Sequence, residues 1–87
     1  MRLHILNSPD SLPRCKSGVT NADSLILIED AVVLLPSIYS AIDTSTAVYV
    51  LLDDVQRRGI KTPGNVKTLD YLQFVDLCAA HTHCISW

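Results

Sequence analysis

Residues 25–30 read Leu-Ile-Leu-Ile-Glu-Asp, and this junction between a continuous apolar run and two acidic residues decides the fold class. The run has the composition of a buried strand, and acidic residues are favoured at a helix start because they oppose the helix dipole. Three more apolar runs end at residues that favour a helix start: residues 3–6 before Asn7-Ser8-Pro9, 48–52 before Asp53-Asp54, and 66–69 before Asp70-Tyr71. Strand followed by helix four times predicts an α/β fold, a three-layer domain with a mainly parallel sheet of four to five strands.

Length and composition limit the organisation of the chain. Its 87 residues leave no room for a second domain, so we expect residues 1–87 to form one domain. Hydrophobic residues make up 48% of the chain and charged residues only 18%, which is apolar for a domain of this size. We expect part of the apolar surplus to lie in a subunit interface.

The sequence also predicts where the protein acts. No run reaches the ~18 apolar residues of a membrane span, and the polar start at Arg2 and His4 does not match a signal peptide, so we expect a cytoplasmic protein. Three cysteines form no disulfide framework, which favours reduced thiols. A net charge of -2 gives no attraction to nucleic acid or anionic membranes.

Helix and strand signals divide the rest of the chain. The run 3–6 is apolar apart from His4 and predicts a central strand, and Pro13 limits the following helix to a few turns that end near Gly18. Pro36 predicts an interruption of the helix that begins at Glu29 or Asp30. Further expectations are a helix from Asp53 or Asp54 that Gly59 ends, an edge strand at 65–69, an amphipathic helix after Asp70, and a frayed tail at 81–87.

The acidic strand ends do not predict a phosphate or dinucleotide site. Such sites need glycines directly after a strand, and the glycines stand at positions 18, 59 and 64. We interpret the acids as helix caps: Glu29, Asp30, Asp53, Asp54 and Asp70. A small-molecule site at this acidic edge is the alternative.

A second group of candidate residues lies near the carboxyl end of the chain. Cys78, His81, His83 and Cys84 are ligand types that suit zinc, but their spacing matches no common structural zinc site. We therefore predict no metal site and no cofactor. In this interpretation Cys78 packs in the core and the histidines are solvated.

Cys15 is the candidate reactive thiol. It follows the first strand closely and stands between Arg14 and Lys16, whose positive charges would lower the pKa of the thiol and favour the thiolate. The alternative is an inert surface cysteine, because no base is placed beside it by the sequence.

The four junctions taken together resemble the DsrH/TusB family, small subunits of sulfur-relay complexes. The resemblance covers nearly the whole chain and rests on four motifs in order: residues 3–9, residues 25–32, residues 48–51 with Asp54 and Arg58-Gly59, and Asp70-Tyr71 with residues 74–77 and the terminal Trp87. The chain departs from the family pattern at Ala31, where glycine is usual, and at Pro13 and Pro36, which shorten two helices.

The resemblance implies a function. Family members assemble with DsrE/TusD-like and DsrF/TusC-like subunits into a heterohexamer, which receives persulfide sulfur from an upstream donor. The sulfur serves 2-thiolation of the tRNA wobble uridine or dissimilatory sulfur oxidation. The principal sulfur-accepting cysteine belongs to a partner subunit, but some members carry a cysteine fourteen residues before the acidic turn, as Cys15 precedes Glu29.

The leading hypothesis is therefore a sulfur-relay subunit with Cys15 as its candidate persulfide carrier. Whether the chain itself is catalytic stays open, and we expect catalysis to be centred on a partner chain. A purely structural subunit and a stand-alone binding module are the competing hypotheses. We expect no direct contact with nucleic acid or membrane.

Overall fold

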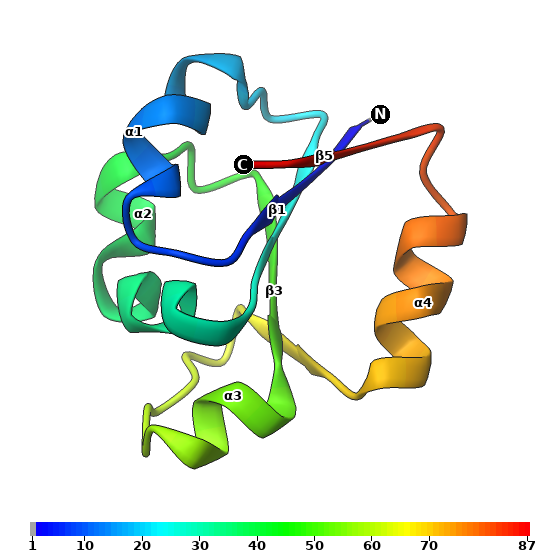
Figure 1. The fold of residues 1–87 in the computed structure, drawn as a ribbon. Coiled ribbons are helices and arrows are strands. Elements are labelled where there is room, and N and C mark those ends of the chain that lie inside the picture. Colours follow the sequence, from blue (N-terminus) through cyan, green and yellow to red (C-terminus); the bar gives the residue numbers. More distant parts are fainter. Residues whose placement is uncertain (1) are drawn as a thin grey trace.

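The computed structural model describes residues 2–87, and its centre is a parallel β-sheet (Figure 1). Within these residues the sheet has five strands, all parallel, in the order β4-β3-β2-β1-β5. The strands are β1 Arg2–Leu6, β2 Ser24–Leu27, β3 Ala47–Leu51, β4 Lys67–Leu69 and β5 His83–Ser86. The predicted α/β class is confirmed.

Helices cover both faces of the sheet. They are α1 Ser11–Cys15, η1 Lys16–Gly18, η2 Glu29–Ser37, α2 Ile38–Ala41, α3 Leu52–Arg57 and α4 Tyr71–Ala79, where η marks a 3₁₀ helix. α1, η2 and α2 lie on one face, and α4 lies on the other, so the domain has three layers (Figure 1). No helix in residues 2–87 is long and apolar enough to cross a membrane.

The main core lies between the sheet and the η2 layer. All four residues of β2 are buried because both faces of this central strand are covered. The side chains that share this core include Leu6, Leu25, Leu27, Val48 and Val50 from the strands and Ala31, Val32, Leu35 and Ile38 from the helical layer. Full burial of each large aliphatic side chain contributes about 1.5–3 kcal/mol, so this cluster is the main source of stability.

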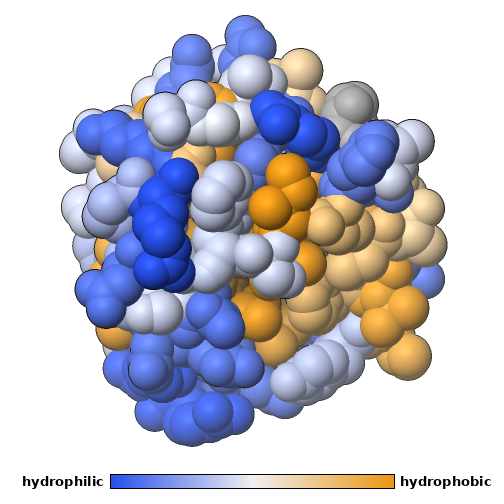
Figure 2. Space-filling view, turned by 45° about the horizontal axis from the view of Figure 1, so that its top comes forward, coloured by the Kyte–Doolittle hydropathy of each residue, from blue (hydrophilic) through white to orange (hydrophobic). Residues whose placement is uncertain are grey.

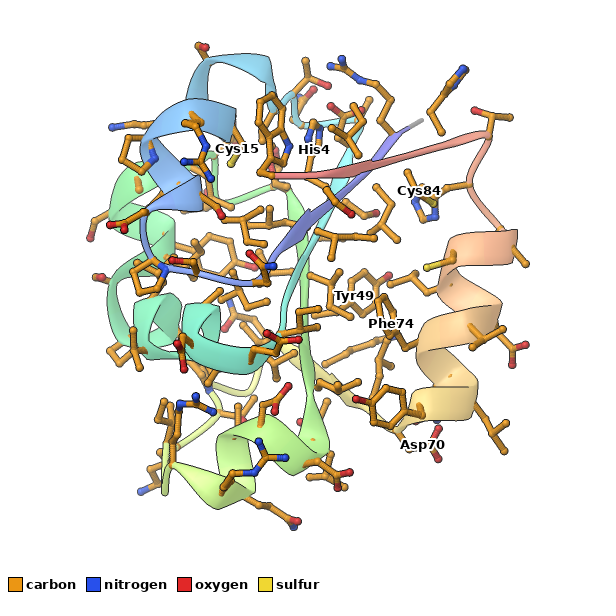
Figure 3. The ribbon with its side chains drawn as sticks, viewed as in Figure 1. His4, Cys15, Tyr49, Asp70, Phe74 and Cys84 are labelled. Atoms are coloured by element: carbon orange, nitrogen blue, oxygen red, sulfur yellow. The ribbon has the colours of Figure 1, made fainter. Side chains whose placement is uncertain are left out.

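The opposite face of the sheet is covered more thinly. None of the α4 residues is fully buried. Tyr49 of β3 and Phe74 of α4 point toward one another in the layer between them (Figure 3). Both side chains stay partly exposed, so α4 seals this face less completely than η2 seals the other.

Several predicted elements are confirmed by the structure. β1 is an interior strand between β2 and β5, and β4 is an edge strand whose Lys67 is exposed. Helical turns after β1 end at Gly18 as predicted. Gly59 ends the turn after α3 with a φ of 62°, the left-handed geometry that favours glycine.

The segment that follows β2 is helical but winds as a 3₁₀ helix for most of its length. η2 runs to Ser37 and a single α-helical turn, α2, follows it. Pro36 lies inside η2 and has no backbone N–H to donate, so the interruption predicted at this proline is confirmed. The prediction did not foresee the 3₁₀ winding before it.

The frayed tail predicted at residues 81–87 is wrong. His83–Ser86 form β5, which pairs in parallel with β1. The Trp87 N–H also donates to the carbonyl oxygen of Ile5 at 3.0 Å. The strand forms because β1 offers a free edge for pairing. The short and polar sequence of β5 does not by itself indicate a strand.

Candidate functional site

Cys15 occupies the last position of α1 and is fully buried. Ser11 and Cys15 lie four residues apart, which places both on the face of α1 that packs on the sheet, while Arg14 and Lys16 are exposed. The Cys15 thiol donates to the carbonyl oxygen of Leu12 at 3.6 Å. Its polar contact in the core is therefore local to its own helix.

Burial raises the pKa of the Cys15 thiol above its usual value, although its backbone hydrogen bond and Arg14 act in the opposite direction. The expectation that flanking charges lower this pKa is wrong, because removal of water from the thiol outweighs the field of an exposed guanidinium. At rest Cys15 is a protonated thiol.

A buried polar cluster lies between β1 and the loop before β2, where the sequence had singled out no functional residue. Asp23 accepts hydrogen bonds from the Arg2 N–H at 3.2 Å, the Arg2 guanidinium at 3.1 Å, the Thr20 N–H at 3.2 Å and the His4 ring at 3.0 Å. Burial alone would raise the pKa of Asp23, but the hydrogen bonds from His4, Thr20 and Arg2 hold it well below its usual range. Asp23 is therefore a carboxylate at neutral pH.

The same cluster fixes the tautomer of His4, which is fully buried. The indole of Trp87 can only donate, and its Nε1–H lies 3.0 Å from His4 Nδ1. His4 Nδ1 therefore accepts, and Nε2 carries the proton that His4 donates to Asp23. The two rings also stack, with centroids 6.1 Å apart and an angle of 18° between their planes.

Trp87 connects this cluster to α1. Its main-chain oxygen accepts hydrogen bonds from the Ser11 hydroxyl and the Arg14 guanidinium, each at 3.0 Å. Its ring packs against the main core, to which Cys15 also belongs. Cys15 and His4 accordingly both lie near the edge of the sheet that β1 and β5 form (Figure 3).

The acidic strand ends are occupied by structural contacts. Asp70 accepts from the Gln73 N–H at 2.8 Å and forms a capping box with it, as predicted. In η2 and α3 no side chain caps the helix start, so the predicted caps at the other acids are wrong. Asp54 instead accepts from the Glu29 N–H at 2.7 Å across two strand ends, and Asp30 pairs with Arg58.

The Glu29–Asp54 bond has a conformational role. Glu29 has a φ of 51°, in the left-handed region that a residue with a Cβ atom rarely adopts. The carboxylate of Asp54 stabilises this turn by binding its N–H.

The four residues near the carboxyl end do not form a metal site. No group of three or more His, Cys, Asp or Glu side chains within residues 2–87 could hold a metal ion. His81 is used structurally, through Leu77 O at 2.8 Å and Ser24 Oγ at 3.2 Å, and His83 is exposed. Cys78 is half-buried on α4 rather than in the core, which corrects the packing predicted for it.

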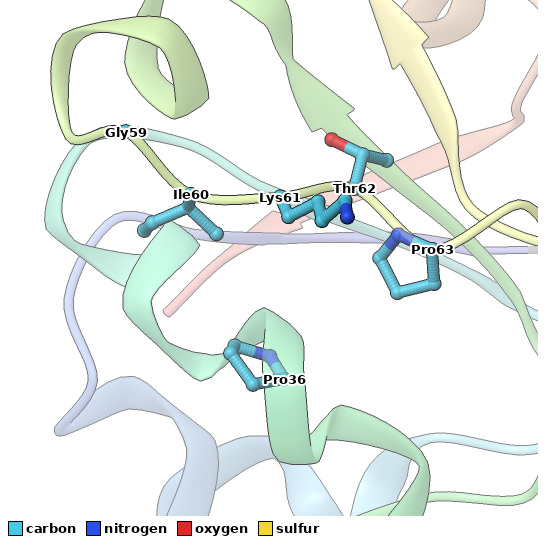
Figure 4. A pocket seen from close by; sticks show the side chains of 6 residues that line it. All are labelled: Pro36, Gly59, Ile60, Lys61, Thr62 and Pro63. Carbon is cyan, nitrogen blue, oxygen red and sulfur yellow. The ribbon is translucent and has the colours of Figure 1, made fainter.

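An apolar hollow lies on the surface beside η2. It is lined by Pro36 and by the loop after α3, residues 59–63 (Figure 4). Lys61 is the only ionisable residue of this lining. A single lysine without a charged partner does not make a catalytic site.

Comparison with known proteins identifies the family. A family model described as "DsrH like protein" matches residues 7–84. The chain belongs to the DsrH-like family. Protein TusB of Pectobacterium parmentieri is similar to this DsrH-like chain, with 29% identity over an alignment 94 residues long. The alignment covers 98% of this chain and 99% of that protein. The resemblance inferred from the four junctions is confirmed.

Proposed function

We propose that this DsrH-like protein is a subunit of a cytoplasmic sulfur-relay complex that serves 2-thiolation of the tRNA wobble uridine. The observation that carries the proposal is the family match, which spans all but the two ends of the chain. Similarity to a TusB protein over nearly the full length of both chains supports the same role. A DsrH-type subunit in dissimilatory sulfur oxidation is the alternative within the family.

Nucleoside analysis tests the pathway. In a strain that lacks this gene, mass spectrometry of digested tRNA should show loss of the wobble 2-thiouridine, and the intact gene supplied on a plasmid should restore it. Unchanged 2-thiouridine together with a defect in sulfur oxidation would replace the proposal with its alternative.

We further propose that the chain works in a hetero-oligomer with DsrE/TusD-like and DsrF/TusC-like subunits. Three apolar side chains of α4 support an interface, because Tyr71, Leu72 and Val75 are 63%, 78% and 62% exposed. Figure 2 shows apolar surface that reaches the side of the molecule on which α4 lies in Figure 1. Contact of these apolar side chains with water is unfavourable, and a partner chain that covers them removes this cost.

Light scattering tests the assembly. Co-expression with the neighbouring gene products should give a complex larger than the isolated chain. A monodisperse monomer that ignores these partners would favour a stand-alone binding module instead.

Within the relay, Cys15 is our candidate persulfide carrier. Its thiolate would attack the terminal sulfur of a donor persulfide, so that a new sulfur–sulfur bond forms at Cys15 while the donor cysteine leaves as a thiolate. Full burial of Cys15 means that α1 has to move before this attack. A partner that displaces the Ser11 and Arg14 contacts to Trp87 would provide such a movement.

The burial of Cys15 also favours a second candidate, a structural subunit without transfer chemistry. Transfer of labelled sulfur through the reconstituted complex separates the two, with Cys15→Ser as the test variant and Ser17→Ala, at an exposed position close to Cys15 in the chain, as the control. The carrier role predicts that transfer falls to background in Cys15→Ser and stays normal in the control. Normal transfer in both variants would establish the structural role.

A further inference from the structure

The two remaining cysteines approach each other at the carboxyl end of α4. Cys78 lies in the last turn of α4, and Cys84 is the second residue of β5. The Cys84 thiol donates to the carbonyl oxygen of Cys78 at 3.6 Å. The two side chains also interact with each other: burial first, and then the neighbouring Cys84 thiol, raise the pKa of Cys78.

The sheet register explains why these thiols meet. Cys84 pairs with Leu3, and Leu3 pairs with Ser24, so their side chains lie on the same face of the sheet. His81 bonds to Ser24 from the end of α4, which shows that this is the face that α4 covers. Cys84 therefore lies on the side of β5 that faces the end of α4 (Figure 3).

The same geometry holds the pair in place. His81 bonds to Leu77 O at 2.8 Å on one side and to Ser24 Oγ at 3.2 Å on the other, so it ties the end of α4 to β2. Cys78 and Cys84 flank this tie in the chain. Their approach is thus fixed by a tertiary contact and not by the short connection alone.

Access distinguishes these thiols from Cys15. Cys84 is exposed and Cys78 is half-buried, whereas Cys15 is fully buried. A soluble disulfide can reach Cys84 directly, and Cys78 is then the neighbouring group that can resolve the adduct.

We propose that Cys78 and Cys84 form a thiol–disulfide exchange site that takes a disulfide of the glutathione class as its substrate. The Cys84 thiolate attacks one sulfur of glutathione disulfide, forming a mixed disulfide and releasing one glutathione thiolate. The Cys78 thiolate then attacks the Cys84 sulfur, forming the Cys78–Cys84 disulfide and releasing the second glutathione. The protein loses two electrons and two thiol protons, and one glutathione disulfide becomes two glutathione molecules.

This site does not depend on the proposed relay function, because it uses neither Cys15 nor a partner subunit. Closing the disulfide would join the end of α4 to β5 covalently. α4 carries the exposed apolar side chains Tyr71, Leu72 and Val75, so the oxidation state of the pair would affect that surface.

Peptide mapping of the full-length protein tests the proposal. The reduced protein is incubated with glutathione disulfide, free thiols are blocked with iodoacetamide, and the protein is digested with trypsin. Both cysteines fall in the peptide that follows Lys67. Their disulfide leaves this peptide two hydrogens lighter than the free dithiol, whereas the reduced peptide gains two carbamidomethyl groups. We expect that product, with Cys15 reduced, and a Cys15→Ser variant should give it equally.

Variants in which one cysteine is replaced identify the role of each thiol in the exchange. Cys78→Ser should stop at a stable glutathione adduct on Cys84, and Cys84→Ser should lose most of the reaction because Cys78 is half-buried and Cys15 is fully buried. Stable glutathione adducts on the unmodified protein, or disulfide-linked dimers in place of the internal disulfide, would overturn the proposal. Circular dichroism of each variant identifies any that fail to fold. In that case Cys15→Ser still tests the proposal, because Cys78 and Cys84 are its two remaining cysteines.

Discussion

The indole N–H of Trp87 donates to the buried Nδ1 of His4 at 3.0 Å, which joins the end of β5 to the first strand of the sheet. Because the bond sets which nitrogen of His4 is protonated, it also sets the direction of the His4–Asp23 hydrogen bond at 3.0 Å. One aromatic residue thus completes a polar chain that runs from the surface arginine Arg2 through the interior.

Replacement of Trp87 with phenylalanine tests this chain. Trp87→Phe keeps an aromatic ring but leaves the fully buried His4 Nδ1 without a donor, so we expect the free energy of unfolding to fall by about 1–3 kcal/mol. Urea denaturation measures the change. Tyr71→Phe, which alters an exposed ring, is the control, and equal stability of the two variants would contradict the assigned role of the indole.

Asp23 should give the protein an acid-sensitive stability. Its folded-state pKa lies below the unfolded value of about 3.9, so its contribution is fully present above that value and is lost as the pH falls toward the folded-state pKa. Asp23→Asn should therefore lower stability at neutral pH, by about 3 kcal/mol, and flatten its decline below pH ~4.

Urea titrations at a series of pH values measure this dependence. Asp76→Asn, at an exposed position of α4, is the control and should leave the curve close to that of the unmodified protein. An acid decline of unchanged slope in Asp23→Asn would mean that other carboxyl groups cause it.

Most of the fold could be predicted from the sequence because its signals are local. Apolar runs followed by residues that favour a helix start mark β1 to β4 and the helices after them without any knowledge of contacts. β5 was missed because His83 and Cys84 carry no strand pattern, and the strand exists only through pairing with β1 and the bond from Trp87 to Ile5. These are tertiary contacts, which the local sequence does not encode.

The surroundings of Cys15 could be predicted only in part. Its position after β1 was right, but the charges of Arg14 and Lys16 suggested a polar environment that the thiol does not have. The helical spacing of Ser11 and Cys15 was the overlooked signal, since residues four apart share a face and this face is the buried one. The cluster of His4, Asp23 and Trp87 joins residues from distant parts of the chain, and no spacing rule predicts it.

The capping box at the start of α4 should govern how firmly this helix is formed. Asp70→Ala removes the acceptor of the Gln73 N–H, so we expect a loss of about 1 kcal/mol and faster amide exchange in the first turn of α4. Hydrogen exchange detected by mass spectrometry measures it. Asp70→Asn is the matched control because asparagine caps equally well, and fast exchange in both variants would show that the cap does not limit opening.

The exposed apolar residues of α4 should matter for association more than for folding. Leu72→Ser and Val75→Ser remove side chains that are mostly in water, so stability should change by no more than about 0.5 kcal/mol. If partner subunits cover this face, each variant should weaken assembly about tenfold or more, as truncation of a buried anchor does. Size-exclusion chromatography with light scattering on the co-expressed complex measures the effect.

Val33→Ser is the control for these two variants. Val33 is 48% exposed but belongs to η2, on the opposite layer, so its truncation should leave assembly intact if α4 carries the interface. Equal loss of assembly in all three variants would point to a general effect of surface polarity. Loss in Val33→Ser alone would move the interface to the η2 layer, because a side chain contributes to binding only where the partner removes it from water.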